Sequence, residues 1–485
     1  MEEIRLKVLV DKNKNRVIFA ESDSDFIDVL FCFLTTPIGS IIRLSAEQSL
    51  NVGIGCMNHL YKSVENINVQ SFLTAHSKDM LLYPRNGAEA YFPNLKLRID
   101  SGMGAKFFVC KHENCQESSD GPRLLSYFRN LPCKCGYCTY AEVDMFRRYN
   151  LASKLPFGAN DGGVFVKEMN RYMISDDLQV IPLSSASSIR LLSKCGVTDG
   201  SSIEERTFTF GVVEVLKVLV YSSVSRTPLT DTLLNHKPTA PGTNDLSTCQ
   251  RVWVESQVRG PANQSGNMSI KLIVSKSKNM VCYAEAKKDF VDFLFSFLTV
   301  PLGHVVKQIN HGNLKGCLDQ LYKSVQELDE QVFKSNNHKD ILLRPKVAPG
   351  FSYENDLLGT EEATYPTFYE FKGKLTTDKS HLPCSKPGTR AYKVMEHKKD
   401  GEGSGGFLLG PNLFTVTDNL VVTPISPILG LSILNELKVP FSDIEEKVVH
   451  IGTEEALRLL VSSFVSESAL TDAFIGKPKP EQAHW

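Results

Sequence analysis

The stretch that decides the fold is LKVLVDKNKNRVIFAESDSDFIDVLFCFLTTPIG, residues 6–39. It returns without a gap as IKLIVSKSKNMVCYAEAKKDFVDFLFSFLTVPLG, residues 270–303, with about half of the positions identical. Shorter matches follow in the same order: 56–67 with 317–328, 78–85 with 339–346, and 174–184 with 416–426. The sequence therefore predicts a tandem duplication of one long unit.

The repeat divides the chain into three predicted parts. Residues 1–236 form the first unit and residues 268–485 the second. Residues 237–267 between them are rich in Pro, Gly, Ser and Asn, which is typical of a linker, although VWVESQV within it has the composition of a short strand.

At the start of each unit, the spacing of the apolar residues changes from that of β-strands to that of an α-helix. Residues 4–10 and 16–21 are apolar or β-branched segments around a polar turn, which predicts a β-hairpin. Residues 26–34 then carry apolar side chains at helical spacing and on nearly every side, so we expect a buried, Phe-rich helix. Ser24 and Asp25 suit its start, while Pro37 and Gly39 are expected to end it.

Later segments mix both kinds of element. A second helix carries an apolar stripe on Met57, Leu60, Tyr61 and Val64. Residues 180–182 and 420–424 resemble strands, and helices follow near Ser187 and Pro427. Because strands and helices neither alternate strictly nor separate cleanly, the predicted fold class is α+β.

Composition limits the partners. Lys and Arg number 54 and Asp and Glu 55, so the formal net charge of -1 argues against a uniform field for nucleic acid or anionic lipid. The amino-terminal residues lack the pattern of a secretory signal, and the most apolar run, residues 26–42, is too short to cross a bilayer. We therefore expect a soluble protein of the cytoplasm or nucleus, without a membrane partner, whose 12 cysteines are thiols or metal ligands.

The segment 105–140 of the first unit resembles a zinc ribbon. Cys110 and Cys115 form a C-x4-C pair, and Cys135 and Cys138 form a C-x2-C pair about twenty residues later. Four thiolates in two such pairs are the ligands that tetrahedral zinc prefers. Cys133 is an alternative to Cys135, and His112 could replace a cysteine. The matching stretch of the second unit, residues 367–388, keeps only Cys384, which favours a structural zinc over a catalytic one.

Other polar residues have simpler explanations. Two matching sets of carboxylates could suggest an acid/base site, but Asp25 and Asp28 suit a helix N-terminus, which attracts negative charge. The two sets are Glu21, Asp25 and Asp28, and Glu285, Asp289 and Asp292. Asp231 and Asp472 are expected to cap a turn near the end of each unit. Gly401–Gly406 matches G-x-G-x-x-G without the strand and helix that a dinucleotide site requires, so we expect a flexible loop.

Together, the hairpin, the Phe-rich helix, LYKSVEN, KDMLLYP, the cysteine segment and the closing LTD resemble the plant family known as domain of unknown function 674, over essentially the whole chain. This resemblance implies no activity, cofactor or catalytic residue. Members of that family resemble this chain in a paired-cysteine segment of the Cys-Pro-x-Cys-Gly kind. Residues 132–138, PCKCGYC, depart from that form and leave the choice between Cys133 and Cys135 open.

The leading hypothesis is a non-enzymatic interaction or scaffold protein with one structural zinc ion, an unknown protein partner and two units packed as a pseudo-symmetric pair. One alternative is a zinc-ribbon module that binds nucleic acid or protein. The other is an unrecognised enzyme, for which no catalytic residue stands out. The nucleic-acid alternative draws on basic residues in or beside the cysteine segment: Lys106, Lys111, Arg123, Arg129, Lys134, Arg147 and Arg148.

Overall fold

The structure is a computed structural model of the chain. The residues that it describes are 3–50, 52–99, 106–112, 123–126, 129, 131–132, 137–144, 163–168, 171–234, 268–309, 316–348, 357–364, 368–371, 374–376, 391–394, 406–410 and 413–475. The predicted linker at 237–267 lies outside them, and so do residues 401–405 of the glycine-rich loop.

A five-stranded antiparallel sheet is built on the predicted hairpin of the first half. Its order is β10 (Ile203–Phe210), β1 (Ile4–Asp11), β2 (Arg16–Ser22), β8 (Tyr172–Ser175) and β9 (Val180–Pro182). The hairpin turn is held locally, because the Asp11 carboxylate accepts the backbone N–H groups of Asn13 and Lys14. Along β1, buried and exposed side chains alternate at first, which directs one face of the sheet into the core.

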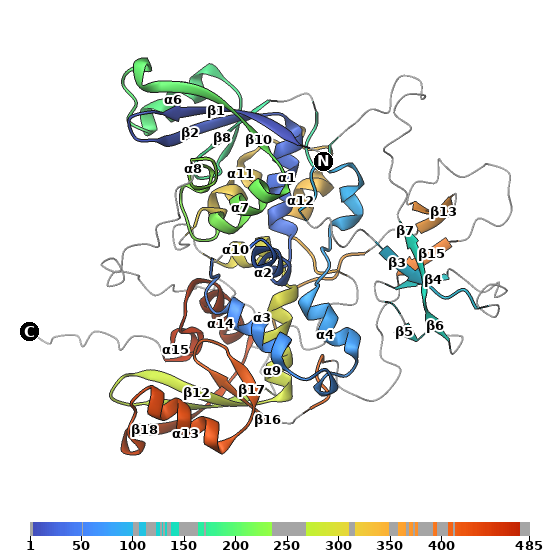
Figure 1. Cartoon of the computed structure of the whole chain (residues 1–485), viewed down its shortest axis with the longest axis vertical. Helices are drawn as coiled ribbons and strands as arrows, with labels where there is room; N and C mark the ends of the chain where they lie inside the picture. Colours follow the sequence, from blue (N-terminus) through green and yellow to red (C-terminus); the bar gives the residue numbers. More distant parts are fainter. Residues whose placement is uncertain are drawn as a thin grey trace, which may run out of the picture.

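The second half forms a sheet with the same order. Its strands are β18 (Ile444–His450), β11 (Ser269–Ser275), β12 (Met280–Lys287), β16 (Leu413–Thr417) and β17 (Val422–Pro424). The register of the hairpin shifts between Ile273 and Val274, as it does between Leu9 and Val10 in the first sheet. The two sheets lie at opposite ends of the main body (Figure 1).

Helices fill the space between the two sheets (Figure 1). In the first half these are α1 (Ser24–Thr35), α2 (Ile38–Glu47), α3 (Met57–Asn66), α4 (Ala75–Leu82), α7 (Val212–Ser222) and α8 (Pro228–Leu233). In the second half they are α9 (Lys288–Ser296), α10 (Leu302–Gln308), α11 (Leu318–Glu327), α12 (Asn336–Leu343), α14 (Thr453–Val465) and α15 (Ala469–Phe474). Short 3-10 turns accompany them: η1 (Val69–Ser71), η2 (Glu89–Asn94), η3 (Gly200–Ser202), η4 (Phe297–Thr299), η5 (Glu330–Val332) and η7 (Phe441–Asp443).

Two further helices, α6 (Ser185–Lys194) and α13 (Pro427–Glu436), pack against β2 and β12. Separate small apolar clusters lie beneath them, one with Leu191 and the other with Leu434. The predicted Phe-rich helix is confirmed as α1, since its residues from Phe26 to Thr35 are all buried.

The two halves exchange helices. Helix α3 of the first half contacts β17 of the second, and α11 of the second contacts β9 of the first. Ser63 Oγ accepts the Val422 N–H at 2.9 Å, and Ser324 Oγ accepts the Val180 N–H at 2.9 Å. Each sheet is therefore covered in part by the other half of the chain, and the halves share one hydrophobic core.

The helix after α1 differs from the expectation. Helix α1 ends at Thr35 as predicted, but Gly39 lies within α2 and does not terminate a helix. A Cβ atom at Gly39 would lie 3.0 Å from the Leu298 carbonyl oxygen. The glycine therefore permits close packing against the other half, a role that a single helix pattern does not reveal.

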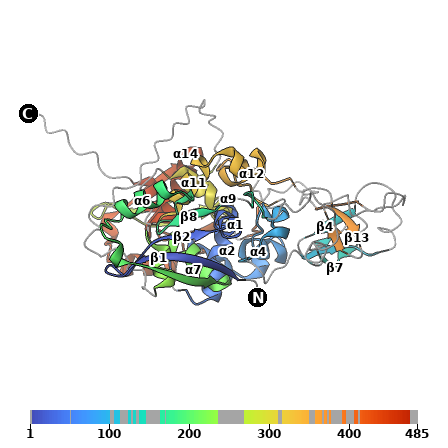
Figure 2. The ribbon, with the colours of Figure 1, turned by 90° about the horizontal axis from the view of Figure 1, so that it is seen from above.

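A third sheet combines strands from both halves beside the main body (Figures 1 and 2). Its order is β14 (Lys374–Thr376), β13 (Phe368–Phe371), β15 (Ala391–Val394), β4 (Arg123–Ser126), β3 (Lys106–Val109) and β7 (Ala141–Asp144). Strands β4 and β15 join the two halves in parallel. A short hairpin of β5 (Leu131–Pro132) and β6 (Cys138–Thr139) accompanies this sheet. With its antiparallel sheets and helices, the molecule is consistent with the predicted α+β class.

Close contact between the halves makes Gly316 sensitive to substitution. A Cβ atom there would lie 1.9 Å from the Ser222 carbonyl oxygen, which already accepts the Cys317 N–H. Gly316→Ala is expected to lower the free energy of unfolding by about 2–4 kcal/mol, because backbone must move to admit the methyl group. Urea-induced unfolding measures this loss.

Gly200→Ala is the matched control, since a Cβ atom at Gly200 meets nothing within 4 Å. Its effect should stay within about 0.5 kcal/mol. Equal losses in the two variants would contradict the close packing of the halves at Gly316.

Candidate functional site

The predicted metal ligands are only partly within the described residues. Cys110 directly follows β3 and is buried, whereas Cys138 begins β6 and is exposed. Cys115, Cys133 and Cys135 lie outside the described residues. Among the residues that the structure describes, no three His, Cys, Asp or Glu side chains are grouped so as to hold a metal ion. The zinc site therefore stays a prediction.

One contact does bring the two cysteine motifs together. The rings of His112 and Tyr137 stack with centroids 3.5 Å apart and an interplanar angle of 12°. His112 lies two residues after Cys110, and Tyr137 directly precedes Cys138. Pro132 also pairs with Cys138, in the antiparallel pair of strands β5 and β6. The structure therefore brings together residues that lie next to Cys110 and Cys138.

The carboxylates of the first half do not converge on one site. Asp25 forms an ion pair with Lys96, whose Nζ lies 2.6 Å from Oδ2. Asp28 instead accepts the backbone N–H groups of Val164, Phe165 and Val166. The expected role of Asp28 at the helix N-terminus is thus wrong: only Asp25 lies in the first turn, and Asp28 fastens a distant segment to α1.

The second half repeats this anchor. Asp292 accepts the N–H groups of Phe407 and Leu408 at 2.8 and 2.9 Å. Gly406 is close enough that a Cβ atom would lie 1.8 Å from Asp292 Oδ2. Because buried backbone donors require partners, a carboxylate in this place explains why the acidic position recurs in both halves.

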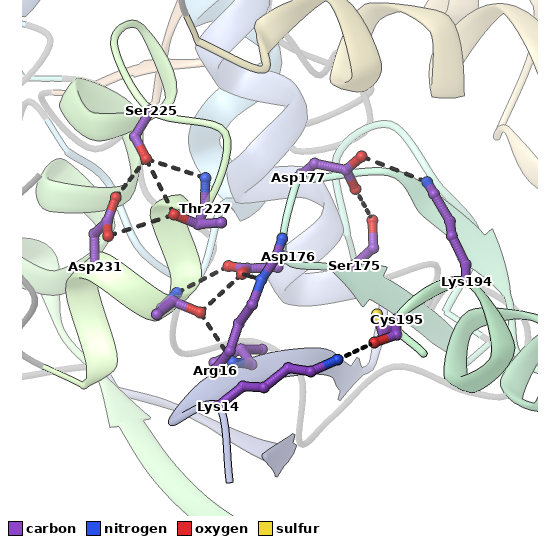
Figure 3. A network of polar contacts seen from close by, with 12 residues as sticks. Lys14, Arg16, Ser175, Asp176, Asp177, Lys194, Cys195, Ser225, Thr227 and Asp231 are labelled. Carbon is purple, nitrogen blue, oxygen red and sulfur yellow. Dashed lines mark hydrogen bonds and ion pairs between the residues drawn. The ribbon is translucent and has the colours of Figure 1, made fainter. Parts of the chain in front are cut away.

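A second repeated network surrounds the β8–β9 turn (Figure 3). Asp176 accepts the Thr230 N–H at 2.9 Å, the Thr230 hydroxyl at 2.8 Å and Arg16 Nε at 2.9 Å. The Thr230 hydroxyl oxygen accepts the Val17 N–H at 2.9 Å. Burial raises the pKa of Asp176 to about 6, although Thr230 and Arg16 favour its charged form. This network ties the hairpin to α8.

In the second half, the closing Leu-Thr-Asp motif supplies the threonine of the corresponding network. Asp418 accepts the N–H and the hydroxyl of Thr471, each at 2.7 Å. Met280 stands where the first half has Arg16, so the network is smaller there. The expectation that Asp231 and Asp472 cap a turn stays a prediction: both lie within helices, α8 and α15, where they accept the hydroxyl groups of Ser225 and Ser466.

A cavity of about 50 Å³ lies beside α2 in the first half. It carries three guanidinium groups, those of Arg43, Arg85 and Arg98. Arg43 and Arg85 are buried, and each forms an ion pair with a glutamate four residues later.

Comparison with known proteins identifies a family. A family model described as "Protein of unknown function (DUF674)" matches residues 1–454. The chain belongs to the DUF674 family. No curated protein and no solved structure matches it.

Sequence reasoning missed two features of this DUF674 protein. Asp28 and Asp292 were visible as a repeated position, but their backbone partners lie more than a hundred residues away. Arg43 was visible as a charge inside the apolar run 41–44. The other two guanidiniums of the cavity follow α4, where no periodic pattern marks them.

In the described part of the DUF674 chain, no helix is long and apolar enough to span a membrane.

Asp28 should make stability depend on pH. Burial raises its pKa from 3.8 to about 6, against the opposing effect of three backbone N–H donors. Between these values the folded chain keeps the proton that the unfolded chain releases, so this contribution to stability is full below 3.8 and is lost as pH rises through 6. From about pH 4 to about pH 7, the wild type should lose about 2 kcal/mol relative to Asp28→Asn.

Urea unfolding of both proteins at the two pH values measures that difference. Groups that titrate elsewhere affect both proteins equally and cancel. A difference between wild type and variant that stays constant over this range would show that Asp28 does not titrate as expected.

Proposed function

We propose that this DUF674 protein is a non-enzymatic interaction scaffold of the cytoplasm or nucleus, formed by tandem duplication and stabilised by one zinc ion in its first half. The observation that carries the scaffold role is the use of the repeated polar residues. Asp28 and Asp292 bind backbone N–H groups of distant segments, and Ser63 and Ser324 do so across the two halves. The groups common to both halves thus serve the fold.

The proposed zinc site uses Cys110, Cys115, Cys138 and either Cys135 or Cys133. The stacked rings of His112 and Tyr137 support it, because they hold the two cysteine motifs near each other. Zinc would fix the β5–β6 hairpin against β3. Since β3 belongs to a sheet shared by both halves, a metal at this place would also stabilise the attachment of that sheet.

A protein partner is favoured over nucleic acid. Tyr137 and Tyr140, in the cysteine segment, are 52% and 49% exposed. Exposed tyrosines are typical of protein interfaces, where a ring provides large contact area at a low entropic cost. Lys111 and Arg129 are also exposed, but the net charge of -1 gives the chain no general attraction for a polyanion. We therefore propose that the cysteine-bearing end of the third sheet contacts a protein.

Metal analysis tests the zinc site. The purified wild type is expected to contain about one zinc ion per chain. Cys110→Ser and Cys138→Ser should each lower the zinc content well below that of the wild type and reduce the melting temperature, because a structural zinc contributes its binding energy to folding. Elemental analysis and a thermal unfolding scan supply the two readouts.

Cys195→Ser is the control, since this thiol lies at the end of α6, away from the third sheet. It should keep the zinc content of the wild type. An unchanged melting temperature after treatment with a chelator would refute the structural role, and full zinc content in Cys138→Ser would exclude that ligand.

A further inference from the structure

Helix α13 presents an apolar surface to solvent. Helices α6 and α13 lie at the two outer ends of the main body, each over a small cluster separate from the shared core (Figure 1). On α13, Ile428 and Leu431 lie about one turn apart and are 79% and 49% exposed. Leu413 and Ile425, which are 42% and 39% exposed, adjoin the start of this helix. We call these four residues the α13 patch.

The four side chains belong to one continuous surface. The Ile425 N–H donates to the Leu413 carbonyl at 3.3 Å, so the two residues lie opposite each other where β16 begins and β17 ends. Because Phe414 and Val416 point into the core, Leu413 points to the outer face of the sheet, as the alternation along a strand requires. Ser426, the N-cap of α13, follows Ile425 directly. The patch therefore extends from the end of the sheet onto the first turns of α13.

The first half shows that the fold does not require these apolar residues. The Leu183 N–H donates to the Arg171 carbonyl at 2.9 Å, and Ser184 is the N-cap of α6, so each position of the patch has a counterpart. The residues that correspond to Leu413, Ile425, Ile428 and Leu431 are Arg171, Leu183, Ala186 and Ile189. Arg190 adds a second exposed cation on α6, where α13 has Ser432. Since the same helix folds on the same sheet with that more polar surface, the apolar surface of α13 has a cause other than folding.

The α13 patch is also free of charge. From Ile425 to Asn435 the sequence contains no charged residue. Charged groups lie at the edges, with Lys287 in the sheet and Glu436 and Lys438 at the end of α13. A different protein is commonly selected by complementary charges, which the patch does not offer. A two-fold axis places each residue near its own copy, where apolar side chains fit and only like charges repel.

We propose that the α13 patch binds a second copy of this chain, with α13 of one protomer packed on α13 of its partner about a two-fold axis. Contact between the copies would remove Ile428 and Leu431 from water, which is the driving force of the association. A contact through α6 would instead bring Arg171 and Arg190 against their own copies. Association therefore stops at a closed dimer and does not continue through both ends of the molecule. This inference depends neither on zinc nor on the scaffold role.

Sedimentation of the full chain over a range of concentrations tests the proposal. A standard interface involves about 20 residues a side, more than the patch itself, so we expect a reversible dimer with a dissociation constant of about 1–100 µM. The mean mass should rise with concentration from 54.0 kDa, the mass of one chain, toward twice that value. Salt at about 0.5 M should not weaken the dimer, because apolar contacts are not screened. Amide hydrogen exchange in α13 should slow at high concentration, whereas exchange in α6 should not change.

Ile428→Asp should raise the dissociation constant at least about tenfold, because two carboxylates would be brought into an apolar contact. Ala186→Asp is the matched control, since it adds the same charge at the equivalent exposed position of α6. It should leave the dissociation constant within about twofold of the wild-type value. Both side chains point to solvent, so both variants should melt within about 2 °C of the wild type.

The mass of a single chain at every concentration would overturn the proposal. A dimer that Ile428→Asp does not weaken, or one that Ala186→Asp weakens equally, would do the same. Dissociation of the dimer at high salt would also contradict it, since that result indicates contacts between charged groups.

Discussion

The rest of the structure depends on a reciprocal crossing at the centre of the molecule. The Ile38 N–H donates to the Val300 carbonyl at 3.1 Å, and the Leu302 N–H donates to the Thr36 carbonyl at 2.9 Å. Gly39 approaches Leu298 O and Gly303 approaches Leu34 O, so each helix begins against the end of the other half's Phe-rich segment. Side chains larger than hydrogen at these glycines would separate the two backbones. Without this contact, the helices could not pass to the opposite sheets.

The crossing also explains the distribution of buried polar groups. A helix that packs on the sheet of the other half buries backbone N–H groups at the strand ends and turns that it covers, and these groups need hydrogen-bond partners. Ser63 and Ser324 provide such partners across the halves, and Asp28 and Asp292 provide them for the segments that return from the third sheet. These are hydrogen bonds to buried backbone, where leaving a donor without a partner costs about 1–3 kcal/mol. Their recurrence in both halves therefore follows from the architecture alone.

This architecture separates what the sequence could predict from what it could not. The spacing of apolar residues predicts the hairpin, α1 and α3, and the structure confirms them. This spacing shows which face of a helix is buried but not which segment covers that face. The exchange of α3 and α11 between the sheets could therefore not be predicted. For the same reason Gly39 looked like a terminator. The cysteine segment had a readable spacing, whereas the three arginines of the cavity are joined only by folding.

The two asymmetric features of the first half lie on connected parts of the chain. Arg85 lines the cavity, and its guanidinium carbon is 6.0 Å from the ring centroid of Phe107 on β3. Strand β3 leads directly to Cys110, so one cation–π contact links the cavity wall to the start of the cysteine segment. Asp28, on the helix that ends beside the cavity, holds the chain at 164–166, after that segment. Strand β3 and residues 164–166 are therefore each held by a side chain of the main body. The Arg85–Phe107 contact is thus a direct physical connection between the cavity wall and the third sheet.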